Sequence, residues 1–195
     1  MTTTIQSPRD LKPGTEAEST FRRWVSHLNE EFTRHPSVDR RSEIVRDELY
    51  QLFLGRPHGG KLNATLVSEL ASNTLFEGFD PRNVTLEPEY DGEIDYELYA
   101  PRKPLVYFWQ MFDRSPLGLN YWLGLRFRHM IALHVFKHVG KGVRIYPHVD
   151  FTFGYNITLE DNCSIGRGAY LDDRHALVLS AGTQVAPHSR IVARA

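Results

Sequence analysis

One histidine stands in a sequence setting that could support acid–base chemistry. His175 ends the run Asp172-Asp173-Arg174-His175, so two carboxylates precede it closely in the chain. A carboxylate near an imidazole raises the pKa of the ring and fixes its tautomer, and such a histidine can act as a general base. The alternative interpretation is a solvent-exposed histidine at a corner of the chain, beside acidic neighbours.

A repeat of 20 residues in the last third of the chain determines which elements would position these residues. In rows of 20 from Val139, apolar residues form three columns: Val139, Leu159 and Leu179; Ile145, Ile165 and Val185; Phe151, Leu171 and Ile191. Most positions four residues after the first two columns carry a small or β-branched residue, and Cys163 is one of these. The period of six predicts triangular coils of three short strands, stacked at about 4.8 Å with paired backbones. Cys163 is then expected to be a small core residue.

The histidines do not predict a metal site. His148 and His188 share a column two coils apart, roughly 10 Å, which is too far for one ion to bind both directly. Three further histidines, His129, His134 and His138, do not share one face of a helix, so they do not predict a metal site either.

The sequence before the repeat predicts a flexible segment 1–15 and a mainly helical region 16–138. A first helix begins near Glu16 and ends at His35-Pro36, and Ser37 could cap a second helix that Gly55 breaks. A short third helix is expected around residues 64–71.

Residues 73–115 carry four prolines, an acidic stretch and an aromatic cluster, and they predict an irregular loop with one or two short strands. A fourth helix is expected from about Leu117 to Lys137. Its basic and aromatic character fits either a cap across the end of the repeat or docking on a membrane surface, and the need of repeat stacks for caps favours the first.

The stretch from Phe151 to Asp172 resembles the maltose and galactoside O-acetyltransferases of the hexapeptide-repeat acyltransferase superfamily. The resemblance rests on Phe153-Gly154-Tyr155-Asn156-Ile157 and on Leu171-Asp172, and it covers about residues 136–195. It implies an α+β chain in which a helical N-terminal region precedes a left-handed parallel β-helix of about three coils, residues 139–195. It also implies a homotrimer with active sites between subunits.

The same resemblance implies the chemistry. A histidine base would activate an acceptor hydroxyl, which attacks the thioester of acetyl-CoA, and Asn156 and Asp172 match the Asn and Asp that line the acceptor pocket. The family's histidine aligns with position 196, after Ala195, and the coils that usually form most of the CoA groove would follow it. In the rows of 20 that position stacks on residue 176, so the adjacent His175 is the candidate catalytic base.

Two alternative functions fit the repeat and the resemblance. The first is an O-acyltransferase that uses acetyl-CoA or another acyl-CoA, without a metal, and a sugar or similar hydroxyl acceptor. The alternative is a non-catalytic, degenerate β-helix that serves trimerisation or binding. A net charge of −1 gives no reason to expect nucleic acid, and a single cysteine with no secretory signal suits the cytoplasm.

Overall fold

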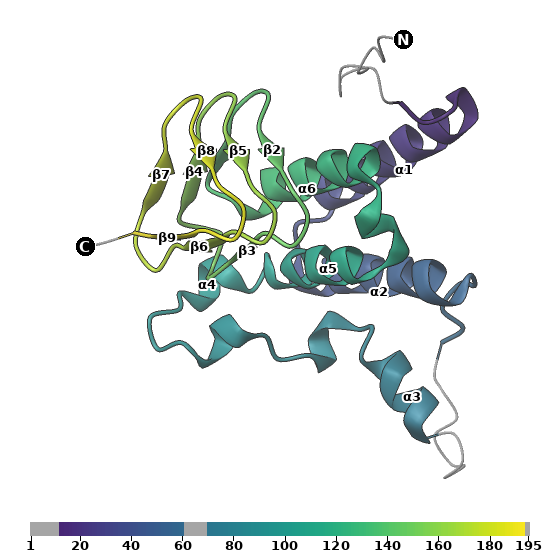
Figure 1. The fold of residues 1–195 in the computed structure, drawn as a ribbon. Coiled ribbons are helices and arrows are strands. Elements are labelled where there is room, and N and C mark those ends of the chain that lie inside the picture. Colours follow the sequence, from purple (N-terminus) through teal and green to yellow (C-terminus); the bar gives the residue numbers. More distant parts are fainter. Residues whose placement is uncertain (1–11, 61–69, 194–195) are drawn as a thin grey trace, which may run out of the picture.

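The computed structural model describes residues 12–60 and 70–193, with a helical N-terminal part followed by stacked strands (Figure 1). This α+β arrangement agrees with the sequence prediction. Most of the predicted flexible segment 1–15, and most of the predicted helix around residues 64–71, lie outside the described residues. No helix in the described ranges is long and apolar enough to cross a membrane.

The first two predicted helices are confirmed: α1 (Thr15–Arg34) and α2 (Val38–Leu54). Before α2, the hydroxyl of Ser37 accepts a hydrogen bond from the backbone N–H of Arg40 at 3.4 Å, as an N-cap does. Gly55 ends α2 with φ at 64°, a left-handed conformation that glycine adopts without a steric penalty. Buried residues of the two helices include Leu28, Phe32, Val45 and Leu49.

Short helices follow: α3 (Leu70–Glu77), η3 (Pro81–Asn83), η4 (Glu87–Tyr90), α4 (Tyr96–Tyr99), α5 (Lys103–Arg114) and η5 (Pro116–Leu119). The expectation of strands within 73–115 is therefore wrong, because the described residues there contain none. Pro104 lies in the first turn of α5, where a missing N–H is tolerated. Leu105, Phe108, Trp109 and Phe112 then follow the helical i, i+3, i+4, i+7 pattern and are buried.

The last helix, α6 (Tyr121–Val135), is shorter than predicted and begins after Asn120, whose side chain accepts a hydrogen bond from the N–H of Leu123 at 3.0 Å. It packs against the first two strands of the repeat, at one end of the stack (Figure 1). This position agrees with the prediction that the helix caps the repeat.

The strands form three parallel sheets, and each coil contributes one strand to each sheet. The first sheet contains β1 (His138–Val139), β4 (Ile157–Leu159) and β7 (Leu177–Leu179); the second contains β2 (Arg144–Ile145), β5 (Ser164–Ile165) and β8 (Gln184–Val185); the third contains β3 (Asp150–Phe151), β6 (Tyr170–Asp172) and β9 (Arg190–Val192). Every strand pair is offset by 20 residues, as Phe151 opposite Leu171 shows, so the predicted register is confirmed. We call residues 138–193 the coil stack.

Side chains inside the coil stack follow the predicted columns. Ile145, Ile165 and Leu171 are fully buried, and so is Cys163, whose thiol donates to the carbonyl oxygen of Ser180 at 3.2 Å. His148 and His188 are exposed and have φ near 60°, so both lie at corners of the coil stack.

The helical part and the coil stack share one core. The indole of Trp109 on α5 packs against Phe136 and Phe151, with ring centroids 6.0 and 5.4 Å apart. A fully buried ion pair between Arg128 of α6 and Asp113 of α5 lies at the same junction. Asp113 also accepts a hydrogen bond from the backbone N–H of His148 at 2.8 Å, so helices and coils are held in a defined arrangement.

Candidate functional site

The three predicted site residues lie at one corner of the coil stack, where the third sheet turns into the first. Asp172 ends β6, His175 lies in the turn between β6 and β7, and Asn156 immediately precedes β4. The register stacks the turn after β6 on the turn after β3, one coil away. The fold therefore brings Asn156 into the same corner as Asp172 and His175.

Asp172 is the centre of a group of polar side chains. Its carboxylate accepts hydrogen bonds from Arg174 and Arg190, each at 2.8 Å. Thr152 donates a longer hydrogen bond of 3.4 Å to the same carboxylate and makes a 2.9 Å bond with the hydroxyl of Tyr170. We call these five residues the Asp172 cluster.

The Asp172 cluster keeps its central carboxyl group ionised. Asp172 is 2% exposed, and this burial alone would raise its pKa. The hydrogen bond from Arg190 and the positive charge of Arg174 outweigh burial, so the pKa lies below the ordinary value. Asp172 is thus a weak base, although it can accept a hydrogen bond from a ligand hydroxyl. The side chains of Arg174 and Arg190 are 38% and 61% exposed, so both can move away from it.

The neighbouring carboxyl group, Asp173, has a different environment. It is fully buried and accepts hydrogen bonds from the backbone N–H groups of Phe153 at 2.7 Å and Asn156 at 3.2 Å. Burial raises its pKa, and these backbone hydrogen bonds only partly oppose that effect. Asn156 reciprocates, since its amide donates to the carbonyl oxygen of Asp173 at 2.9 Å. Asp173 and Asn156 thereby hold two stacked turns together.

His175 is exposed on this corner. Among the described residues it makes no hydrogen bond or ion pair, because Asp172 is bound by arginines and Asp173 by backbone N–H groups. His175 therefore follows Asp172 and Asp173 closely in the sequence, but it forms no hydrogen bond or ion pair with either carboxylate.

The segment 91–95 of the helical part covers the same corner, which no sequence pattern predicts. The hydroxyl of Tyr155 accepts a hydrogen bond from the backbone N–H of Asp95 at 2.9 Å, and Arg174 donates to Asp91 at 2.8 Å. Figure 1 shows the chain just before α4 running alongside the third sheet. Between the two lies a cavity of about 30 Å³, lined in part by Gln110, Asp150 and Tyr170, so an acceptor sugar does not fit inside it.

Sequence reasoning missed Tyr170 and Arg190 in this site. Both occupy the outward column of the third sheet, with Asp150, and they alternate with inward apolar residues. That alternation is visible in the sequence and would have placed them on one face of the sheet.

A larger groove lies at another corner of the coil stack, outside the second sheet. Its volume is about 550 Å³ and its walls include Tyr121, Tyr146, Arg167 and His188. The rings of Tyr121 and Tyr146 meet edge to face, with centroids 6.0 Å apart. The groove thus combines aromatic rings with a guanidinium group, which together suit a nucleotide.

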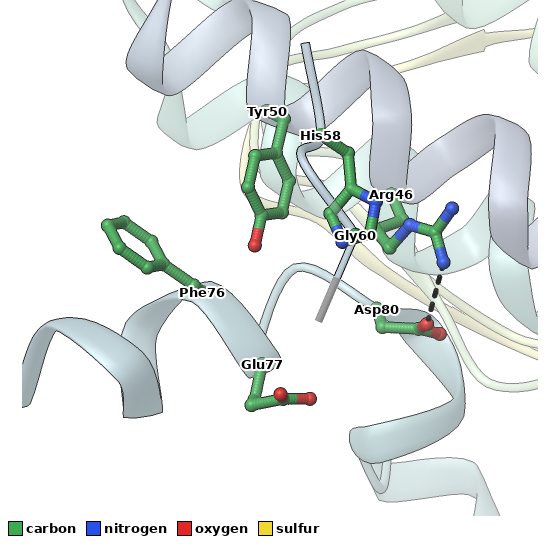
Figure 2. A pocket seen from close by; sticks show the side chains of 7 residues that line it. All are labelled: Arg46, Tyr50, His58, Gly60, Phe76, Glu77 and Asp80. Carbon is green, nitrogen blue, oxygen red and sulfur yellow. Dashed lines mark ion pairs between the residues drawn. The ribbon is translucent and has the colours of Figure 1, made fainter. Parts of the chain in front are cut away.

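The helical part contains a pocket of about 290 Å³ between α2 and α3 (Figure 2). Tyr50 and Phe76 form its aromatic side, and an ion pair of 3.8 Å between Arg46 and Asp80 lies opposite. His58 packs edge-on against the ring of Tyr50, with centroids 4.7 Å apart.

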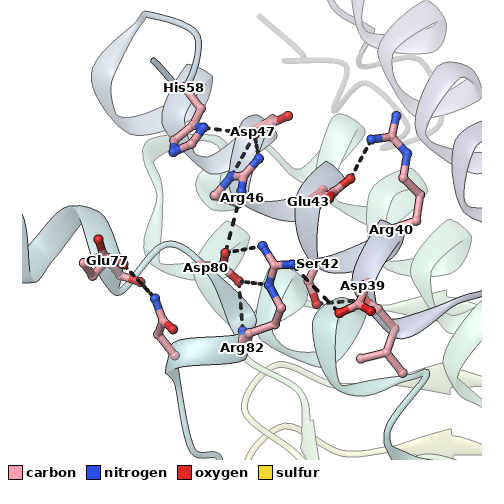
Figure 3. Close-up of polar contacts among 12 residues, drawn as sticks. Asp39, Arg40, Ser42, Glu43, Arg46, Asp47, His58, Glu77, Asp80 and Arg82 are labelled. Carbon is pink, nitrogen blue, oxygen red and sulfur yellow. Dashed lines mark hydrogen bonds and ion pairs between the residues drawn. The ribbon is translucent and has the colours of Figure 1, made fainter. Parts of the chain in front are cut away.

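The charges around this pocket neutralise one another (Figure 3). Arg82 donates two side-chain hydrogen bonds to Asp80, at 2.6 and 2.9 Å, and Arg46 donates to Asp47 at 2.8 Å. Burial would raise the pKa of Asp80, but the hydrogen bonds from Arg82 hold it below its ordinary value. The ion pair between Arg46 and Asp80 joins α2 to the turn before η3, so we assign this group of charges a role in packing.

No group of three or more His, Cys, Asp or Glu side chains that could hold a metal ion occurs within the described ranges. In comparisons with known proteins, no model of a protein family matches the chain, and no curated protein matches its sequence significantly.

Proposed function

We propose that this chain is an acyltransferase of the hexapeptide-repeat class, with a left-handed β-helix, that moves an acyl group from acyl-CoA to a hydroxyl of a sugar or similar acceptor. The observation that carries the proposal is the in-register stack of 20-residue coils, which gathers Asn156, Asp172 and His175 at one corner. The resemblance of residues 136–195 to O-acetyltransferases supplies the class of reaction.

In this proposal the acceptor binds at the outer surface of the Asp172 cluster. Arg190 swings away from the carboxylate of Asp172, which then accepts a hydrogen bond from an acceptor hydroxyl. Asn156 holds the turn that shapes the corner. Because the lowered pKa makes Asp172 a poor base, the exposed imidazole of His175 is the better candidate for proton removal.

The proposed reaction transfers the acyl group directly from CoA to the acceptor. His175 removes the proton of the acceptor hydroxyl while the oxygen attacks the thioester carbonyl carbon. The carbon–sulfur bond breaks, and the leaving thiolate of CoA takes a proton from the imidazolium. The products are an ester and free CoA, and neither a metal nor a redox cofactor takes part.

The groove lined by Tyr121, Tyr146 and Arg167 is the proposed binding site for acyl-CoA. The two tyrosine rings offer stacking surfaces for adenine, and Arg167 offers a bidentate partner for phosphate. The third sheet separates this groove from the corner that carries His175. Donor and acceptor would therefore meet between neighbouring chains, which favours a homotrimer.

Release of CoA thiol in the presence of candidate sugar acceptors tests the proposal. The full chain should consume acetyl-CoA, and His175→Asn should lower turnover by about 10² to 10⁴ with an unchanged circular dichroism spectrum. His138→Asn is the matched control, since His138 is another exposed histidine of the coil stack. Equal turnover in the two variants would overturn the role of His175.

A non-catalytic module for self-association or binding is the second candidate, and one observation favours it. Asp172 is bound by two arginines, and Asn156 bonds to the backbone of Asp173, so two of the three candidate site residues already make contacts that hold the fold. Calorimetry with acetyl-CoA separates the two candidates. Binding that Arg167→Gln weakens about tenfold supports the transferase, whereas no binding by an assembled oligomer supports the module.

We also place the protein in the cytoplasm. The single cysteine, Cys163, is a buried free thiol, which suits a reducing compartment. Recovery of the untagged protein in the soluble cytoplasmic fraction tests this placement, and recovery from another compartment would contradict it.

A further inference from the structure

A groove of about 720 Å³ runs between α1 and α6, next to the edge of the coil stack, and has no part in the proposed acyl transfer. It lies at a different place from both the Asp172 cluster and the groove of Tyr121 and Tyr146. Its volume falls in the range of about 300–1,000 Å³ that is usual for small-molecule sites.

The floor of the groove is apolar, with Leu125, Met130 and Leu133 of α6 among its lining residues. Leu133 is 50% exposed, although it lies on the helix that caps the coil stack. A row of side chains of this kind offers binding surface for an alkyl chain.

The rim of the groove is basic. Arg22, Arg126 and Arg144 all line it, and its lining includes no Asp or Glu. Arg22 is already bound to Glu18 at 2.6 Å, and the charge of Glu18 also attracts Arg126, so Arg144 carries the least compensated charge at the rim. The side chain of Arg144 makes no hydrogen bond or ion pair with any described residue, and the guanidinium of Arg126 lies over the ring of Trp122 and donates to the backbone carbonyl oxygen of Trp122 at 2.8 Å.

The positive charges of Arg22 and Arg126 at this rim repel each other. The guanidinium of Arg126 lies 3.6 Å from the centroid of the Trp122 ring, and that of Arg22 lies 5.1 Å from it. Burial, followed by the charge of Arg22, lowers the pKa of Arg126. An anion at the rim would relieve this repulsion.

We propose that this groove binds the monomeric anion of a medium- or long-chain fatty acid. The alkyl chain lies along Leu125, Met130 and Leu133, and the carboxylate binds Arg126 and Arg144. A guanidinium group matches the two oxygens of a carboxylate, and the apolar floor matches the chain. Charge and shape together select an amphiphilic anion over a neutral or cationic one.

Calorimetric titration with octanoate, nonanoate and decanoate tests the proposal. Each added CH₂ should tighten binding by about fourfold, because each buries further apolar surface. Arg144→Gln should weaken decanoate binding by about tenfold, whereas Arg23→Gln, an exposed arginine of α1 outside the groove, should leave it unchanged. A quenching or shift of tryptophan fluorescence that Trp122→Phe removes gives a second readout, since the chain has three tryptophans.

Leu133→Asp provides a further test that does not depend on an arginine. The position is half exposed, so the variant should fold with an unchanged circular dichroism spectrum, yet its carboxylate should abolish decanoate binding. Equal weakening by Arg144→Gln and Arg23→Gln would overturn the proposal. So would equally tight binding of decyltrimethylammonium, or binding to phosphatidylglycerol vesicles without binding to decanoate monomers.

The outcome is separable from that of the acyl-transfer proposal. Arg144 and Leu133 line neither the Asp172 cluster nor the groove proposed for acyl-CoA. Loss of decanoate binding in these variants should therefore leave CoA thiol release unchanged.

Discussion

Two aspartates of this chain are each held by two arginines, one in the helical part and one in the coil stack. In both cases one arginine follows the aspartate by two residues, as in Asp80 with Arg82 and Asp172 with Arg174. Both carboxyl groups are largely buried, and both have a lowered pKa although burial opposes it. The same local arrangement thus recurs in two unrelated settings.

The surroundings of the two aspartates differ. Asp80 also accepts a hydrogen bond from the backbone N–H of Arg82 at 3.0 Å and so caps the short helix η3. Asp172 instead binds Arg190 from the next coil and Thr152 from the preceding one. The first arrangement ends a helix, and the second holds a carboxylate across stacked coils beside an exposed histidine. An aspartate bound by two arginines is therefore no sign of function by itself. The residues around it decide its role.

The ion pair between Asp113 and Arg128 is more deeply buried than the arginine pairs of Asp80 and Asp172, since both of its side chains are almost fully buried. Asp113→Asn should lower the free energy of unfolding by about 3–5 kcal/mol, because it leaves the charge of Arg128 buried without a counter-ion. Urea denaturation measures the change. Glu43→Gln, at the exposed pair with Arg40, is the control and should change stability by less than about 1 kcal/mol. Similar losses in the two variants would contradict this account.

Asp172→Asn should destabilise the protein more than Asp80→Asn does. The first change weakens two charge-assisted hydrogen bonds at a residue that is 2% exposed, and roughly 2 kcal/mol is expected. An asparagine at position 80 can still cap η3, so about 1 kcal/mol or less is expected there. Thermal unfolding followed by circular dichroism compares them, and the reverse order would contradict the assignment of roles.

The adjacent carboxyl groups Asp172 and Asp173 should respond to pH in opposite directions. The lowered pKa of Asp172 stabilises the fold above the unfolded pKa of about 3.9, and this contribution is lost as the pH falls through the folded pKa. The stability difference between the wild type and Asp172→Asn should therefore shrink below about pH 4.

The raised pKa of Asp173 has the opposite sign. Its carboxylate costs stability at neutral pH, and that cost disappears as the pH falls through the raised folded pKa towards about 3.9. Between neutral pH and pH 4, the wild type should therefore gain stability relative to Asp173→Asn. Urea denaturation at a series of pH values measures both differences, and parallel curves for the two variants would contradict the assigned shifts.

The smallest effects are expected at the exposed arginines. Arg190→Gln and Arg82→Gln should each change stability by less than about 1 kcal/mol, because these side chains are 61% and 36% exposed. Their effects on the neighbouring carboxyl groups remain measurable by NMR titration. Arg190→Gln should raise the pKa of Asp172 and leave that of Asp80 unchanged. A change at both aspartates would show that the clusters are not independent.

The coil stack could be predicted from sequence because its repeat is local and regular. A column such as Ile145, Ile165 and Val185 fixes the register, since each coil pairs with the next at a constant offset of 20 residues. The corner that holds Asn156, Asp172 and His175 follows from the same register.

The helical part was predicted less well. The prolines of residues 73–115 favour irregular chain, but Pro104 lies in the first turn of α5 and does not interrupt the helix. The cover over the candidate site could not be read from sequence either. Asp95 and Tyr155 lie 60 positions apart, and Asp91 and Arg174 lie 83 apart, so only tertiary packing brings them together.

The most direct test of the central claim is the rate of acetyl-CoA thiol release by the full chain with a panel of sugar acceptors. The proposed function predicts acceptor-dependent release that His175→Asn lowers by about 10² or more, while His138→Asn retains it. Release that depends on no acceptor, or that is equal in the two variants, would contradict the claim that this corner of the coil stack transfers acyl groups.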